Sequence, residues 1–173
     1  MENELDLKAL WSISYGLYVV TSHSDGKLNG QIANTVFQVT AEPARLAVSI
    51  NKENLTHEYI AKSGAFAVSI LDEDTPMEFI GLFGFKSGKE VDKLAQVTFK
   101  EGATGCPLVT DNALSILEAK VINRLDVGSH TIFVGELVSA EVLRKGKPLT
   151  YAFYHEKKRG KSPKKAPTYR GNQ

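Results

Sequence analysis

The segment from Gly30 to Ile50 places the strongest constraint on how this chain folds. It contains two stretches of strand-like composition separated by Glu42-Pro43, a pair typical of turns. The first stretch does not alternate cleanly, because Ala33, Asn34 and Thr35 stand where a core strand carries large apolar side chains. Such a strand packs poorly by itself unless a flat molecule with polar edges lies against its backbone. The sequence therefore predicts a pair of strands that borders a ligand.

Length and composition indicate a single soluble domain. The chain has 173 residues, of which 42% are hydrophobic, and domains commonly run to roughly 100–200 residues. No run approaches the ~18 apolar residues that a membrane span needs, and the acidic N-terminus lacks the layout of a signal peptide. The one cysteine, Cys106, excludes an internal disulfide framework and a multi-cysteine metal cluster. We therefore expect a cytoplasmic protein that holds no metal and enters no membrane.

The net charge of +1 hides a basic C-terminal end. Seven of the 21 Lys and Arg residues lie in residues 155–173, where Glu156 is the one acidic residue, leaving 14 basic and 19 acidic residues in the rest of the chain. A mildly acidic body argues against a nucleic-acid partner. We expect a domain over residues 1–154 and a basic tail over 155–173, which is either a solvated end or a segment that touches an anion.

Hydrophobic patterning predicts mostly strands, with two or three short helices. Helices are expected over about 5–13, from Asn51 or Asn54 to about 62, and from the capping box Thr75-Pro76-Met77-Glu78 to about 83. Besides the pair in 30–50, strands are expected over about 17–21, 65–71, 96–100, 113–123, 131–143 and 149–154, with a hairpin turn at Asp25-Gly26. In residues 65–71 large side chains share one face and small ones the other, which suits a small closed barrel. The predicted fold is mainly β, a barrel with helical excursions.

Several common catalytic motifs are absent from the sequence. The run from Gly84 to Lys89 fails as a phosphate loop, because its spacing is one residue short and Glu90 stands in place of the Ser or Thr. The chain has no dinucleotide-binding glycine fingerprint and no His-Glu-x-x-His motif, and its four histidines lack metal-ligand spacing. These absences argue against a Rossmann dinucleotide site and against a zinc site.

The run Asn51-Lys52-Glu53-Asn54-Leu55-Thr56 is a better candidate for a binding site. It opens a predicted helix, whose N-terminus offers free backbone N–H groups and a partial positive charge. Lys52, Asn54 and Thr56 add side-chain donors. These features fit a phosphate group, but ordinary helix capping accounts for the same residues, and spacing alone leaves both readings open.

Several runs taken together carry a resemblance to a known family. Ala-Asn-Thr-Val-Phe at 33–37, Asp-Lys-Leu at 92–94, Gly-Cys-Pro-Leu at 105–108 and Gly-Ser-His-Thr-Ile-Phe-Val-Gly-Glu at 128–136 resemble motifs of the flavin reductase-like, FMN-binding split-barrel family. The resemblance covers roughly residues 8–154. The chain departs from the family pattern at Leu94, where an aromatic residue is usual, at Ser129 in place of Asp, and at Leu137 in place of Val.

The resemblance implies a site for each part of the cofactor. The ring of FMN would be edged by Ala33, Asn34, Thr35 and Val36, and its phosphate would be held by Asn51, Asn54 and Thr56, with Lys93 nearby. The catalytic residue would be His130, facing the flavin and the incoming nicotinamide. Cys106 occupies a variable position of its motif, and either a reactive or a small structural role is open to it.

The resemblance also implies a function. It is that of a split-barrel homodimer, Greek-key-like in topology, which passes electrons from NADH or NADPH to a flavin or to a protein acceptor such as rubredoxin. An FMN-bound electron carrier without its own nicotinamide site is the alternative, and a non-flavin binder such as a haem protein is a third possibility. The tail is similar to that of the flavoredoxins and of the flavin part of high-molecular-weight rubredoxins. It is expected either to be solvated or to lie over the flavin of the neighbouring subunit through Tyr154, Thr168 or Tyr169.

Overall fold

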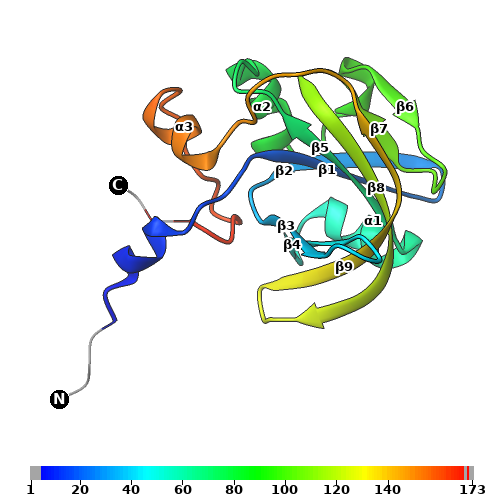
Figure 1. Cartoon of the computed structure of the whole chain (residues 1–173), viewed down its shortest axis with the longest axis horizontal. Coiled ribbons are helices and arrows are strands. Elements are labelled where there is room, and N and C mark those ends of the chain that lie inside the picture. Colours follow the sequence, from blue (N-terminus) through cyan, green and yellow to red (C-terminus); the bar gives the residue numbers. More distant parts are fainter. Residues whose placement is uncertain (1–4, 170, 172–173) are drawn as a thin grey trace.

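The architecture is a curled antiparallel sheet with short helices at its margins. A computed structural model describes residues 5–169 and Gly171. The first four residues of the predicted domain, and Arg170 with the last two residues of the predicted tail, lie outside the described residues. Seven strands form one sheet in the order β2-β1-β5-β8-β9-β4-β3 (Figure 1), and β6 (Phe99–Glu101) and β7 (Pro107–Val109) form a small second sheet. The strands of the large sheet are β1 (Tyr18–Ser24), β2 (Lys27–Ala33), β3 (Val36–Thr40), β4 (Arg45–Asn51), β5 (Ala65–Leu71), β8 (Ala113–Asp126) and β9 (His130–Val142).

Among the described residues, three short α-helices and two 3₁₀ helices precede, separate or follow these strands. They are η1 (Leu7–Ser12), α1 (Leu55–Ser63), α2 (Met77–Gly84), η2 (Leu94–Gln96) and α3 (Tyr151–Glu156). This arrangement confirms the predicted mainly-β fold with a few short helices. Within the described residues, no helix is both long enough and apolar enough to cross a membrane.

Turn chemistry fixes two of the element boundaries. Asp25 and Gly26, with φ angles of 51° and 75°, join β1 to β2, and residues with positive φ at both central positions make the type I′ turn that suits a two-residue hairpin. Gly64 ends α1 with φ of 69°, a left-handed conformation that costs glycine little. Both turns lie where the sequence predicted them.

The sheet curls because its two edge strands are consecutive in the chain. β2 and β3 are separated by Asn34 and Thr35 alone, and the backbone N–H of Ser49 in β4 donates to the carbonyl of Thr35 over 3.1 Å. The enclosed core includes Val48, Phe66 and Phe133, none of which is measurably exposed. The non-alternating stretch therefore proves to be the end of one strand, a two-residue break and the start of another.

Two local predictions were wrong. The expected strand over 149–154 is the helix α3, because the Thr150 side chain accepts a hydrogen bond from the Phe153 N–H and caps that helix. The capping box at Thr75 does not form, because the Thr75 hydroxyl donates to the Asp72 carbonyl over 2.6 Å and no side chain caps α2. Part of the expected strand over 96–100 belongs to η2.

The basic tail packs against the domain. Helix α3 runs across the predicted boundary between residues 154 and 155. After it the chain turns back towards the β2–β3 side of the sheet, as the orange and red segment of Figure 1 shows, and contacts it through hydrogen bonds from Asn34 and Asn51.

Candidate functional site

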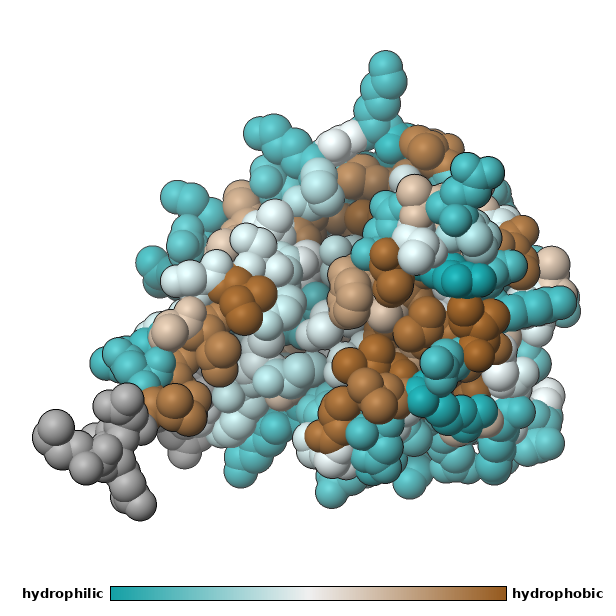
Figure 2. Space-filling model, turned by 60° about the horizontal axis from the view of Figure 1, so that its bottom comes forward, coloured by the Kyte–Doolittle hydropathy of each residue, from teal (hydrophilic) through white to brown (hydrophobic). Residues whose placement is uncertain are grey.

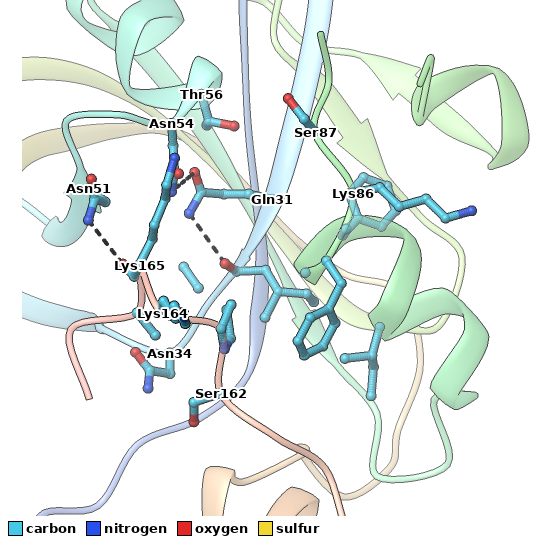
Figure 3. Close-up of a pocket in the computed structure, with 18 of the residues that line it drawn as sticks. Gln31, Asn34, Asn51, Asn54, Thr56, Lys86, Ser87, Ser162, Lys164 and Lys165 are labelled. Atoms are coloured by element: carbon cyan, nitrogen blue, oxygen red, sulfur yellow. Dashed lines mark hydrogen bonds between the residues drawn. The ribbon is translucent and has the colours of Figure 1, made fainter. Parts of the chain in front are cut away.

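A cavity lies between the curled sheet and the tail. Its volume is about 470 Å³, within the range of small-molecule sites. Its walls come from the end of β2, the β4–α1 connection, the end of α2 with the loop after it, and the tail (Figure 3).

One part of this cavity has an apolar wall. Leu17, Ile80 and Phe83 are buried core side chains that line it, and Ala33 contributes a small side chain from the end of β2. The Ala33 side chain is a methyl group, so it fills less of this wall than the other three side chains do. That a flat group lies against this strand stays a prediction.

The opposite part of the cavity presents uncapped helix donors. Asn54 occupies the N-cap position of α1, but its side chain makes no capping bond and its Nδ2 donates instead to Oε1 of Gln31 over 3.1 Å. The Asn51 side chain, at the end of β4, accepts from the Glu53 N–H over 3.0 Å and fixes the chain as it enters the helix. Within the part of the chain that the structure describes, no side chain therefore caps the first turn of α1, and an uncapped N-terminus favours an anion.

Thr56 adds a directed hydroxyl donor beside this helix start. Its side chain is buried, and its Oγ1 accepts a hydrogen bond from Nδ2 of Asn29 over 2.9 Å. A hydroxyl that accepts in this way keeps its own proton to donate. Thr56 lines the cavity, so it is placed to donate to an anion there.

Lys93 is a buried cavity residue with an unusual environment. Its Nζ donates to the carbonyls of Gly30 over 2.9 Å and of Phe83 over 3.2 Å, which ties β2 to the end of α2. Desolvation by burial lowers the pKa of this amine from 10.5 to about 8. Two of the N–H donors of the Lys93 amine are therefore taken up by backbone carbonyls. Lys93 thus links two walls of the cavity and also lines the cavity itself.

The cavity is lined by more positive than negative charge. Among the described residues, the lining includes one carboxylate, Glu53, and six lysines, namely Lys86, Lys89, Lys93, Lys161, Lys164 and Lys165. In Figure 3 the Lys86 side chain points away from the labelled asparagines, so it belongs to the rim. The lining is thus basic although the body of the chain carries more acidic than basic residues, and an anionic ligand fits it best.

His130 lies behind the tail and outside the cavity lining. It opens β9 opposite Asn51 of β4 and is 9% exposed. Its Nε2 lies 3.2 Å from the carbonyl oxygen of Lys165, and its Nδ1 lies 2.8 Å from Oγ of Ser129. Because a carbonyl can only accept, Nε2 carries a proton here, and in the neutral ring Nδ1 accepts from the Ser129 hydroxyl.

The tail supplies a wall of the cavity, whereas the sequence left it either solvated or lying over the flavin of a neighbouring subunit. We call residues 161–168 the strap. Its Lys165 carbonyl accepts from Nδ2 of Asn51 over 3.3 Å, and its Thr168 Oγ1 accepts from Nδ2 of Asn34 over 2.6 Å. These hydrogen bonds join the tail to the cavity of its own chain, and contact of the tail with a neighbouring subunit stays a prediction. The apolar and aromatic residues near 166–169 were the one sequence signal of it.

The structure brings most of the predicted site residues to one place. Of the predicted cofactor-binding residues, Ala33, Asn34, Asn51, Asn54, Thr56 and Lys93 line the cavity. Thr35 and Val36 lie next to it in the chain and are half-buried but do not line it. Gln31, the loop over 84–89 and the strap are lining elements that the sequence reading did not assign.

Cys106 takes no part in this site. It is buried, does not line the cavity, and is a free thiol. Burial raises the pKa of its thiol to about 11, and a thiol with such a pKa is protonated and unreactive at neutral pH. The structural reading of Cys106 is therefore the one this geometry supports.

Comparison with known proteins decides the family. The model of the flavin reductase like domain matches residues 10–160. This chain belongs to the flavin reductase-like family. Membership confirms the predicted family and, with it, the prediction of a flavin-dependent oxidoreductase of the flavin reductase type.

Two relatives are similar to this chain over almost its whole length. A ferric-chelate reductase (NAD(P)H) of Archaeoglobus fulgidus is 55% identical over 95% of this chain and 98% of its own length. A high molecular weight rubredoxin of Moorella thermoacetica is 48% identical over 95% of this chain and 72% of its own length. Among solved structures, the flavoredoxin of Methanosarcina acetivorans has a TM-score of 0.70 and 26% identity, covering 86% of this chain and 78% of its own.

Proposed function

We propose that this flavin reductase-like chain binds FMN in the cavity and passes electrons from NADH or NADPH to an acceptor. The observation that carries the proposal is the pairing of an apolar wall at Ala33 and Phe83 with an uncapped helix start and a basic lining. FMN has a flat ring and one phosphate monoester. The ring needs an apolar wall, and the phosphate needs nearby hydrogen-bond donors and positive charge. Membership of the family favours a flavin as the ligand. Among the described residues that line the cavity, one helix start is uncapped, that of α1, which supports a flavin with one phosphate group.

The lining residues would divide the binding of FMN between them. Ala33 and Asn34 would edge the ring, with Thr35 and Val36 holding the backbone of that edge in place from outside the cavity. Asn51, Asn54 and Thr56 would hold the phosphate at the start of α1, where the helix dipole favours negative charge. Lys93 would add a positive or neutral donor between the two parts. Bound flavin supplies the hydride and electron chemistry, while the protein supplies orientation and electrostatics.

His130 is the proposed residue for orienting the nicotinamide. Its ring is held by Ser129 on one side and by the Lys165 carbonyl on the other. A histidine with a fixed tautomer can present one defined N–H to a partner when the carbonyl that now accepts from it moves away. This role is proposed from the family motif and from the position of His130 next to Asn51.

The acceptor that we propose first is a ferric chelate. The ferric-chelate reductase aligns with this chain over nearly the full length of both proteins. Chelates of ferric iron with polycarboxylates are anionic, and the lysine-rich rim of the cavity would attract them. Rubredoxin is the second proposed acceptor, since the chain matches most of a high molecular weight rubredoxin. An FMN-bound carrier that receives electrons from another protein is the rival function that this second relative favours.

Two measurements test these proposals. The purified chain should show the absorbance of oxidised flavin, and extraction should release FMN and not haem or FAD. Oxidation of NADH and NADPH should then be followed with free FMN, a ferric chelate or a rubredoxin as the acceptor. Turnover of either nicotinamide supports the reductase, whereas flavin absorbance with no nicotinamide oxidation by any acceptor would favour the carrier.

We also propose that the chain forms a homodimer. Apolar side chains gather on the projecting N-terminal segment, next to the grey residues of Figure 2, and on a second area of the same face. Leu5, Leu7 and Leu10 are 80%, 64% and 56% exposed, and Leu125 at the end of β8 is 60% exposed. Exposed apolar area of this kind marks interaction surfaces. Sedimentation should give twice the 19.0 kDa chain mass, and a stable monomer that keeps its flavin would refute the dimer.

A further inference from the structure

We propose that the strap, residues 161–168, is a lid that must open for the flavin to enter and leave the cavity. The inference rests on the proposed flavin site and concerns how that site is closed. The strap forms one wall of the cavity, and its backbone and side-chain oxygens take hydrogen bonds from residues assigned to cofactor or substrate. The strap thus forms part of the cavity wall and also contacts Asn34, Asn51 and His130, the residues proposed to bind the cofactor or the nicotinamide.

One end of the strap is anchored to buried aromatic residues. The Tyr154 hydroxyl donates to the carbonyl of Lys161 over 2.9 Å, and the Tyr151 hydroxyl forms a hydrogen bond with Ser162. Both tyrosines are in α3 and are buried, with 3% and 6% of their surface exposed. This end is therefore fixed to the body and serves as the base on which the strap can move.

The other end is held by a small set of polar contacts. The Lys165 carbonyl accepts from both Asn51 and His130, and the Thr168 hydroxyl accepts from Asn34 and donates to the Tyr151 hydroxyl over 3.0 Å. The ion pair between Lys165 and Glu53 spans 3.0 Å, but its side chains are 50% and 71% exposed. Exposed ion pairs contribute little stability. The hydrogen bonds of the Lys165 carbonyl and the Thr168 hydroxyl are therefore the main contacts that hold this end of the strap against the body.

The strap is more weakly held than the walls that β2 and α2 form. It lies outside every helix and strand, and the side chains of Lys164, Lys165 and Pro167 are exposed. The lining side chains of β2 and α2 include buried residues, whereas the loop over 84–89 is irregular and exposed like the strap. Segments with few buried contacts open at the lowest free energy, so the strap opens more readily than the walls of β2 and α2.

A lid and a fixed wall predict different binding kinetics. Weakening a lid raises the fraction of open molecules with and without flavin, so the association and dissociation rates of FMN both increase. Weakening a fixed wall removes contacts from the bound state alone, so only dissociation accelerates. Stopped-flow quenching of FMN fluorescence measures both rate constants on the full-length chain.

Two conservative variants weaken the strap at opposite ends. Tyr154→Phe removes the hydrogen bond to Lys161 and keeps the buried ring. Thr168→Val removes two hydrogen bonds, the one from Asn34 and the one to the Tyr151 hydroxyl. Thr110→Val is the matched control, because it removes a half-buried threonine hydroxyl bonded to Thr98, in the connection that follows β7. A single hydrogen bond between neutral groups shifts an equilibrium by roughly two- to tenfold. Tyr154→Phe should therefore raise both rate constants by about two- to tenfold and Thr168→Val by more, and both should leave the dissociation constant within about threefold.

The outcomes separate the lid from the proposed function. Faster dissociation with unchanged association, unchanged rates in both strap variants, or an equal effect of Thr110→Val would each overturn the lid while leaving the flavin site intact. Failure of the unaltered chain to bind FMN would overturn the proposed function itself.

Discussion

Lys93 should make the stability of this protein rise with pH in the alkaline range. Its amine is 4% exposed, it pairs with carbonyls instead of a carboxylate, and burial lowers its pKa from 10.5 to about 8. Below about pH 8 the amine is protonated in the folded and unfolded chain, and the cost of burying the charge is fully present. As pH rises towards 10.5, the folded chain loses its proton before the unfolded chain does, and this cost is relieved. One pKa unit corresponds to 1.36 kcal/mol, so the relief between about pH 7 and pH 9.5 is about 2 kcal/mol.

Replacement of Lys93 by Met removes this titration and nearly keeps the length of the side chain. Urea unfolding of both chains at about pH 7 and pH 9.5 gives the change in unfolding free energy for each. The difference between the two changes isolates Lys93, because Cys106 and the tyrosines titrate in both chains. Lys89→Met, which removes an exposed lysine from the same cavity lining, is the control and should behave like the unaltered chain. Equal pH dependence in the unaltered chain and Lys93→Met would refute the reasoning.

Three further predictions follow from the same contacts. Thr56→Val should weaken FMN by ~1.5–3 kcal/mol, the value of a hydrogen bond to a charged group, and leave riboflavin binding unchanged in a fluorescence titration; equal losses for both ligands would place the phosphate elsewhere. His130→Ala should keep FMN and slow nicotinamide oxidation by ~10²-fold, the low end for a positioned acid–base group, whereas loss of flavin at full turnover rate would make it a cofactor ligand. Glu118 is 1% exposed, and its carboxylate accepts hydrogen bonds from the N–H groups of Ala103 and Thr104 and from the Thr104 hydroxyl. Glu118→Gln should therefore lower the unfolding free energy by about 2–3 kcal/mol in urea denaturation. An unchanged urea midpoint would show that these bonds add no stability.

Sequence reading succeeded where a local rule determines the conformation. Asp25-Gly26 and Gly64 were placed correctly because their turns require positive φ angles that few residues adopt. The segment over 149–154 was misread, since its aromatic composition favours a strand. The outcome there depends on the Thr150 cap and on the burial of Tyr151 and Tyr154, which are tertiary facts.

The candidate site likewise contains residues that the sequence could identify and residues that it could not. Asn51, Asn54 and Thr56 are close together in the chain, so a local motif could find them. The strap could not be placed, because its contacts join residues far apart, such as Asn34 and Thr168 with a separation of 134 residues. Neither could the environment of Lys93, whose Nζ reaches the carbonyl of Gly30 across a separation of 63 residues.

The walls of the cavity come from four distant parts of the chain. A molecule bound there would contact all four parts and would hold them together in the folded state. A ligand that binds only the folded state, at 100 times its dissociation constant, raises the unfolding free energy by ~2.7 kcal/mol. The steady-state amount of a marginally stable protein in a cell depends on its unfolded fraction, which chaperones and proteases remove. The abundance of this protein should therefore follow the supply of flavin, with chains made during flavin shortage degraded sooner than those made when flavin is plentiful.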